Sequence, residues 1–189
     1  MRAIANCLSL FRLVSVVPLL LLAWAGQPVG FLLLLLTAFA TDAADGWFAR
    51  RAAPNTNAAL GARLDSYADY TLCFAVLVGI WWLWPGIMAR EAFWLGLIVV
   101  AYALPGAAAI VRFGRPAAYH SWGAKAAVAV VAPALLLLLA GGPAWPLRIG
   151  STIALLAGIE QCLMIRIAPG PREEVRSLRH ARRLWRTQG

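Results

Sequence analysis

The sequence predicts an all-α integral membrane protein with six transmembrane helices. Hydrophobic residues make up 62% of the 189 residues, whereas soluble globular domains contain about 45–50% apolar residues. The long apolar runs lack the alternation typical of barrel strands, and helices satisfy their own backbone hydrogen bonds in lipid. We therefore expect a single domain over residues 1–189, with a six-helix core at 1–170 and a basic interfacial tail at 171–189.

Six apolar runs are close to the ~17–25 residues that a membrane helix needs. The helices are expected at about 8–24, 29–50, 58–84, 91–111, 124–139 and 147–167. Gln27-Pro28, Pro85-Gly86 and the Gly-Gly-Pro run at 141–143 predict tight turns. The polar segment at 51–57 and the basic segment at 112–123 predict the longer loops.

The net charge of +9 is distributed on one side of this six-helix arrangement. The residues expected on that side are Arg2, Arg50, Arg51, Arg63, Arg112, Arg115, Lys125 and the arginines of the tail. The other side carries only Arg90 and Arg148. The positive-inside rule therefore predicts a multi-pass protein of the inner or plasma membrane with both termini in the cytoplasm.

The basic tail is expected to lie on anionic membrane lipid, and the alternative is a topology anchor with no chemical role. Its arginines at 172, 176, 179, 183 and 186 share one helical face, and each basic residue near such a surface contributes ~1 kcal/mol. No basic segment is interleaved with aromatics on a soluble domain, which argues against a nucleic-acid partner.

Four aspartates occur within one short stretch of this apolar chain. Asp42 and Asp45 lie at i and i+3 near the end of the second expected helix, and Asp65 and Asp69 lie at i and i+4 near the start of the third. A carboxylate at the centre of a membrane helix costs ~2.5–3.5 kcal/mol. These helices are expected to be antiparallel neighbours, so the four carboxylates would converge on one cavity.

A cluster of carboxylates suits hard cations such as Mg²⁺ or Mn²⁺. Four carboxylates are more than one Mg²⁺ usually takes, which favours two ions. Gly46 and Gly61 would allow close approach to the backbone, and Arg50 suits a phosphate held by the same metals. This pattern predicts a metal-bridged pyrophosphate site at the cytoplasmic interface. The alternative is an ion-pair network between the aspartates and Arg50, Arg51 and Arg63.

The aspartates and their neighbours resemble the signature of the CDP-alcohol phosphotransferase family, Asp-x2-Asp-Gly-x2-Ala-Arg-x(n)-Gly-x3-Asp-x3-Asp. Its fixed positions correspond to Asp42, Asp45, Gly46, Ala49, Arg50, Gly61, Asp65 and Asp69. The start of the chain, Asn6-Cys-Leu-Ser9-Leu-Phe-Arg12, is similar to an opening common in bacterial members. The six expected helices also fit the family, so the resemblance covers essentially the whole chain.

The resemblance implies transfer of a phosphatidyl group from CDP-diacylglycerol to a small alcohol, with release of CMP in phospholipid biosynthesis. It implies two Mg²⁺ or Mn²⁺ ions, one held by Asp42, Asp45 and Asp65 and the other by Asp42, Asp65 and Asp69. It further implies that Asp69 is the general base. The CDP part of the donor would contact Asp45, Gly46, Ala49, Arg50 and Gly61. The resemblance also implies a homodimer.

The acceptor is expected to be glycerol 3-phosphate, because Arg112, Arg115 and Lys125 form a basic cluster suited to an anionic substrate. Inositol phosphate, serine and other alcohols remain alternatives, and positive-inside anchoring alone would also place basic residues there. Phosphatidylglycerophosphate synthases usually follow the last aspartate with lysine, whereas this chain has Tyr70. Phosphatidylserine synthases usually have a Phe-Gly pair further on, whereas this chain has Phe74-Ala75.

Two other kinds of membrane protein carry acidic clusters. A prenyltransferase would lack the Gly-x2-Ala-Arg continuation, and a cation carrier or binding protein would give Gly46, Arg50 and Gly61 no role. Arg12 is an ionisable residue inside the first expected helix, where a functional role and snorkelling to the interface are both open. Glu160 is expected to make an interhelical hydrogen bond, and His120 stays without an assigned role.

Overall fold

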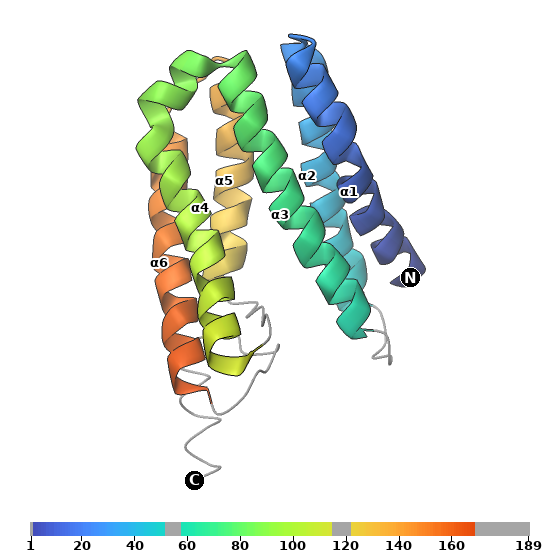
Figure 1. Ribbon diagram of the computed structural model, residues 1–189, viewed down its shortest axis with the longest axis vertical. Helices are drawn as coiled ribbons and strands as arrows, with labels where there is room; N and C mark the ends of the chain where they lie inside the picture. Colours follow the sequence, from blue (N-terminus) through green and yellow to red (C-terminus); the bar gives the residue numbers. More distant parts are fainter. Residues whose placement is uncertain (1, 52–57, 115–121, 169–189) are drawn as a thin grey trace. The chain divides into compact units, whose positions relative to one another are not determined.

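The computed structural model describes residues 2–51, 58–114 and 122–168, with the stretches 2–9, 45–51 and 58–66 and residue 43 described by their backbone alone. Six α-helices follow one another in these residues. They are α1 (Arg2–Trp24), α2 (Pro28–Arg51), α3 (Ala58–Leu83), α4 (Pro85–Phe113), α5 (Trp122–Leu139) and α6 (Trp145–Ile167). The described residues are helical apart from the connections, so the all-α class with six helices is confirmed (Figure 1). The tail at 171–189 lies outside the described residues.

The helix boundaries differ from the expected ones mainly at proline. We expected Pro85-Gly86 to separate two helices, but Pro85 is the first residue of α4, and only Trp84 separates α4 from α3. Proline suits the first turn of a helix because its missing N–H would have no partner there. Pro28 begins α2 for the same reason.

Glycine in the left-handed region ends three of the helices. Gly26 after α1 has φ 66°, Gly114 after α4 has φ 67°, and Gly141 after α5 has φ 90°. After α1, the N–H of Gly26 donates to the carbonyl of Ala23, and the N–H of Gln27 donates to the carbonyl of Leu22. These hydrogen bonds satisfy carbonyls that the helix end would otherwise leave open. The connections α1–α2 and α5–α6 are therefore short, which makes each pair of helices antiparallel.

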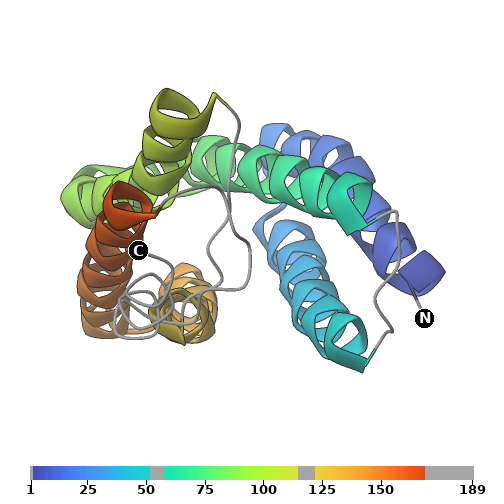
Figure 2. The same cartoon turned by 90° about the horizontal axis from the view of Figure 1, so that it is seen from below.

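The chain divides into two compact units, Met1–Ala89 and Arg90–Gly189. In the first unit, α1 packs against both α2 and α3, an arrangement visible in two views (Figures 1 and 2). The Phe31 ring of α2 also reaches α3 and the residue that follows it: it lies edge-on to Trp84, between α3 and α4, at 5.9 Å between ring centroids. A Cβ on Gly79 would overlap the Phe31 ring, so glycine permits this contact.

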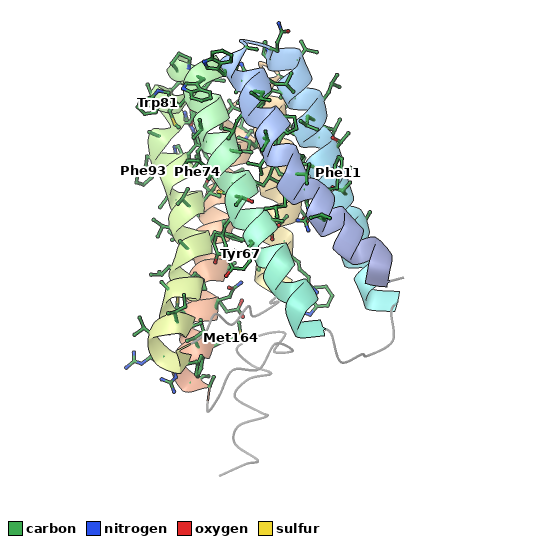
Figure 3. The ribbon with its side chains drawn as sticks, turned by 45° about the vertical axis from the view of Figure 1, so that its right-hand side comes forward. Phe11, Tyr67, Phe74, Trp81, Phe93 and Met164 are labelled. Carbon is green, nitrogen blue, oxygen red and sulfur yellow. The ribbon has the colours of Figure 1, made fainter. Side chains whose placement is uncertain are left out.

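The outward face of α3 is aromatic. Tyr67, Phe74 and Trp81 recur at intervals of seven residues and lie along one side of the helix (Figure 3). Each is between 63% and 65% exposed, which is the expected environment of side chains that face lipid. The opposite face of α3 is thereby left for α1 and α2.

In the second unit, α4 and α6 are parallel and meet at separate points. Near their starts, Glu91 pairs with Arg148, 57 residues later. At mid-length, Gly158 lies against the backbone of Ala101, again 57 residues apart. Near their ends, Arg112 donates to the carbonyl of Ala168, 56 residues later. This nearly constant offset shows that the two helices run side by side in register.

Small residues on α6 allow its close packing. The buried positions of α6 recur in pairs every seven residues, which forms one stripe along the helix; they include Gly150, Ser151, Ala157, Gly158, Met164 and Ile165. A Cβ on Gly150 would lie 3.0 Å from a methyl group of Val131 on α5. Close approach of backbones through small residues is typical of helices that associate in membranes.

Among the described residues, three helices are long and apolar enough to cross a membrane: α4, α5 and α6. The first unit contributes three shorter apolar segments, Leu10–Trp24, Pro28–Asp42 and Tyr67–Leu83. Hydroxyl groups inside these helices donate to carbonyls of their own helix, as Ser15 does to Arg12 and Ser151 to Leu147. The chain is a membrane protein, while six crossings and their orientation stay predictions.

Candidate functional site

The buried faces of α1, α2 and α3 each continue into a charged residue. They comprise Arg12, Ser15, Leu19 and Ala23 on α1; Phe31, Leu35, Ala38 and then Asp42 on α2; and Asp69 followed by Leu72, Val76 and Ile80 on α3. Spacings of three and four residues keep each set on one side of its helix. The apolar part of each face fixes the packing, and this packing brings the three charged residues to one place.

The three charged side chains form a direct ion-pair cluster. The Nη1 atom of Arg12 donates to Oδ1 of Asp42 at 2.6 Å and to Oδ1 of Asp69 at 2.5 Å. The Arg12 side chain is only 1% exposed, whereas Asp42 and Asp69 are 37% and 32% exposed. The cluster therefore has a buried, positive side on α1 and an accessible, negative side on α2 and α3.

The position of Arg12 excludes one of the two expected roles. A snorkelling side chain keeps its charged group in water, whereas the Arg12 guanidinium is buried between helices. The alternative ion-pair network with Arg50, Arg51 and Arg63 stays a prediction, because those side chains lie outside the described residues. Among the described side chains, both aspartates pair with Arg12 of α1.

The two described carboxylates fit a hard divalent cation. Because both oxygen atoms contact one nitrogen atom, they are no farther apart than the sum of the two distances. Carboxylate oxygen is the ligand type that Mg²⁺ prefers, at about 2.0–2.1 Å. One cation position already lies between Asp42 and Asp69, occupied by a guanidinium nitrogen. The chemistry of the donors therefore fits the expected metal site, which stays a prediction.

The remaining predicted residues of the donor and metal sites are described by their backbone alone. Asp45 lies one turn after Asp42 on α2, and Asp65 lies one turn before Asp69 on α3. Gly46, Ala49 and Arg50 are on α2, and Gly61 is on α3. Among the side chains that the structure describes, no three His, Cys, Asp or Glu residues lie together; Asp45 and Asp65 are not among those side chains. Their assignments stay predictions.

Two of the three predicted acceptor residues are described, and both contact other groups of the second unit. Arg112 donates from Nη2 to the carbonyl of Ala168 at 3.0 Å and lies over the Phe113 ring at 5.7 Å. Lys125 places Nζ 5.4 Å from the centre of the Trp122 ring. Arg115 lies outside the described residues, as does His120.

Glu160 contacts the first turn of α5. Its Oε2 atom lies 3.2 Å from the position that a Cβ on Gly123 would take. A carboxylate near a helix N-terminus is electrostatically favourable. Glu160 of α6 therefore lies close to α5, while the expected interhelical hydrogen bond stays a prediction.

Sequence reasoning did not connect Arg12 with the aspartates. The available signal was its position: Arg12 is a cation in the interior of an apolar helix, and it begins the stripe that continues through Ser15, Leu19 and Ala23. A basic residue on the packing face of one membrane helix needs acidic partners on the neighbouring helices.

Comparison with protein families gives one match. The model of the family described as CDP-alcohol phosphatidyltransferase matches residues 2–164. This match includes all six helices almost to the end of α6 and contains the four aspartates and Arg12. Comparisons with curated proteins and with solved structures found no match.

Proposed function

Because the chain belongs to the CDP-alcohol phosphatidyltransferase family, we propose that it transfers a phosphatidyl group from CDP-diacylglycerol to glycerol 3-phosphate and releases CMP. Membership of the family makes the chain an enzyme that transfers a phosphatidyl group from a CDP-alcohol to an alcohol. The identity of the donor lipid and of the acceptor is our proposal. Inositol phosphate and serine are the alternative acceptors.

The observation that supports this proposal most strongly is the convergence of Asp42 and Asp69 on one cation position. The two carboxylates come from different helices and are both partly exposed. A site of this kind suits a substrate whose diphosphate is bound together with metal ions. We propose that Asp42, Asp45 and Asp65 hold one Mg²⁺ or Mn²⁺ ion, and that Asp42, Asp65 and Asp69 hold a second.

Bound divalent ions would neutralise charge on the donor diphosphate and stabilise the leaving CMP. Asp69 is the proposed general base: its carboxylate accepts the proton of the acceptor hydroxyl, whose oxygen then attacks the β-phosphorus of the donor. The bond between that phosphorus and the bridging oxygen breaks, and CMP leaves. The partial exposure of Asp69 supports this role, because the acceptor must reach its carboxylate.

Residues of α2 and α3 are proposed to bind the nucleotide part of the donor. Arg50 would pair with a phosphate, while Gly46, Ala49 and Gly61 would leave room for the nucleotide beside the backbone. Asp45 would contact both donor and metal. These roles follow the family signature.

The acceptor phosphate is proposed to bind to Arg112, Arg115 and Lys125. Arg112 and Lys125 belong to the same end of the second unit, since α4 ends and α5 begins there. Basic residues gathered at this end also support the proposed orientation, with the active site and both termini toward the cytoplasm. A homodimer and binding of the tail to anionic lipid complete the proposal.

The test is CMP release by the purified protein in mixed micelles that contain CDP-diacylglycerol. Mg²⁺ or Mn²⁺ is added with glycerol 3-phosphate, inositol phosphate or serine, and the lipid product is identified by mass spectrometry. We expect turnover only with metal and the fastest turnover with glycerol 3-phosphate. Absence of turnover with every acceptor, in protein that melts cooperatively, would contradict the proposed reaction. A faster reaction with another acceptor would change only the proposed acceptor and would leave the proposed reaction intact.

A further inference from the structure

Arg12 is the buried charged residue at the candidate site to which the proposed reaction assigns no role. It is 1% exposed and lies in an otherwise apolar stretch of α1. Placing a cation there is unfavourable unless acidic partners compensate it. Those partners are Asp42 and Asp69, two of the proposed metal ligands, so the role of Arg12 concerns the metal site directly.

The contacts of Arg12 use the oxygen atoms that a metal ion would need. Nη1 lies 2.6 Å from Oδ1 of Asp42 and 2.5 Å from Oδ1 of Asp69. A divalent cation shared by these oxygens would lie where Nη1 lies, and two positive groups at such short range repel strongly in a partly buried site. The guanidinium and the metal therefore cannot both take this position.

We propose that Arg12 is the resident cation of the carboxylate site and that a divalent metal ion binds by displacing its Nη1 atom from Asp42 and Asp69. This inference rests on the proposed function, because it assumes that these aspartates are metal ligands. Arg12 acts as a positioning residue: it neutralises two carboxylates that would otherwise repel each other and keeps α2 and α3 against α1.

A different role for Arg12 would give the opposite effect on metal affinity. If Arg12 kept its contacts and only oriented the ligands, its removal would loosen the carboxylates and weaken metal binding. If Arg12 occupies the metal position, its removal frees the carboxylates and strengthens metal binding. The sign of the change in affinity therefore separates competition from simple structural support.

The experiment measures Mn²⁺ binding by electron paramagnetic resonance with the full-length protein in detergent micelles, after treatment with EDTA. We expect Arg12→Gln to bind Mn²⁺ at least about tenfold more tightly than the wild type. Arg12→Lys keeps the positive charge and is expected to stay within about threefold of the wild-type affinity. Equal or weaker binding by Arg12→Gln would overturn the proposal.

Melting temperature gives a second readout, with Arg148→Gln as the matched control. Both variants remove an arginine that pairs with a buried or half-buried carboxylate, but Arg148 pairs with Glu91 in the other unit. In EDTA, we expect Arg12→Gln to melt about 5 °C or more below the wild type. Mn²⁺ should reverse most of this loss of melting temperature in Arg12→Gln. It should raise the melting temperature of Arg148→Gln only as much as that of the wild type. Failure of Mn²⁺ to restore Arg12→Gln would overturn the inference.

If Arg12→Gln does not fold, the wild type itself provides the test. Guanidinium nitrogen signals are followed by nuclear magnetic resonance, and the Arg12 signal is assigned by its loss in Arg12→Lys. Saturating Mg²⁺ must shift this signal, because the guanidinium leaves its carboxylate partners. A signal unchanged by Mg²⁺ would overturn the proposal.

The failure of this inference is distinguishable from that of the proposed function. If the wild type releases CMP but Arg12→Gln shows no gain of Mn²⁺ affinity, only the proposed role of Arg12 is wrong. If the wild type releases no CMP with any acceptor but Arg12→Gln binds Mn²⁺ more tightly, the proposed reaction is wrong and the displacement of Arg12 by metal stands.

Discussion

Gly158 of α6 lies directly against the backbone of Ala101 in α4. A Cβ on Gly158 would lie 2.7 Å from the carbonyl oxygen of Ala101 and 3.1 Å from its Cα. Because both neighbouring atoms belong to the backbone, no side chain can rotate away to make room. The parallel pair α4–α6 therefore depends on glycine at this position.

Replacing Gly158 with alanine should destabilise the protein. Overpacking of this kind costs about 1–3 kcal/mol, which corresponds to a fall in melting temperature of roughly 2–10 °C. The matched control is Gly96→Ala on α4, where an added Cβ meets no atom within 4 Å. That variant should melt at or slightly above the wild-type temperature, because alanine favours helix. Equal melting of the two variants would contradict the packing described for Gly158.

The two arginines that pair with Glu91 at the starts of α4 and α6 should contribute unequally to the stability of the protein. Glu91 is fully buried and accepts two hydrogen bonds from Arg148, at 2.9 and 3.0 Å, and one from the adjacent Arg90, at 3.0 Å. We expect Arg148→Gln to lower the melting temperature more than Arg90→Gln, because only Arg148 links two helices. Both decreases in melting temperature should be small, because the arginines are partly exposed and solvent weakens their ion pairs. Thermal melts in detergent check the order, and a larger effect of Arg90→Gln would reverse the interpretation.

Asp69→Asn should nearly abolish CMP release while the protein stays folded. Asparagine keeps the shape of the side chain but cannot accept the proton of the acceptor, and loss of a general base typically lowers the rate by about 10²–10⁴-fold. The readout is kcat with saturating acceptor and metal. Cys73→Ala, one turn later on α3, serves as the control and should keep wild-type turnover. An Asp69→Asn protein with unchanged kcat would show that another group is the base.

Lys125→Ala should weaken binding of the acceptor without affecting the donor. The Lys125 ammonium lies beside Trp122 at the start of α5, and loss of one charged hydrogen bond to a phosphate should raise KM for the acceptor by about tenfold. The KM for CDP-diacylglycerol should stay the same. Arg166→Ala, which removes another exposed basic residue near the end of α6, is the comparison. Similar KM values in both variants and the wild type would remove Lys125 from the acceptor site.

The existence of the six helices could be predicted because each apolar run is long and ends at proline, glycine or charged residues. The start of α4 differs from the prediction because Pro85 predicts a break, whereas proline is equally suited to the first turn of a new helix, where it lies here. The candidate aspartates were also found by sequence, since their spacing is local. A local pattern does not require knowledge of which helices pack together.

The role of Arg12 could not be predicted in the same way. Its partners lie 30 and 57 residues away, and they are brought to it only because α1 packs against both α2 and α3. The same limit applies to Ala101 and Gly158, whose contact depends on the register of two helices separated by α5. Contacts of this kind arise from tertiary packing, which no single stretch of sequence specifies.

The paired contacts at the two ends of α4 and α6 also define a length. From Glu91 to Arg112 along α4, and from Arg148 to Ala168 along α6, the helical rise of 1.5 Å per residue gives about 30 Å. This equals the thickness of the hydrocarbon core of a typical bilayer. The contacts at the two ends of the helix pair are thus separated by about the thickness of the hydrocarbon core. Shifting one helix by one turn along the other would move a charged group about 5 Å toward the hydrocarbon core, so a surrounding bilayer would favour the observed register of the pair.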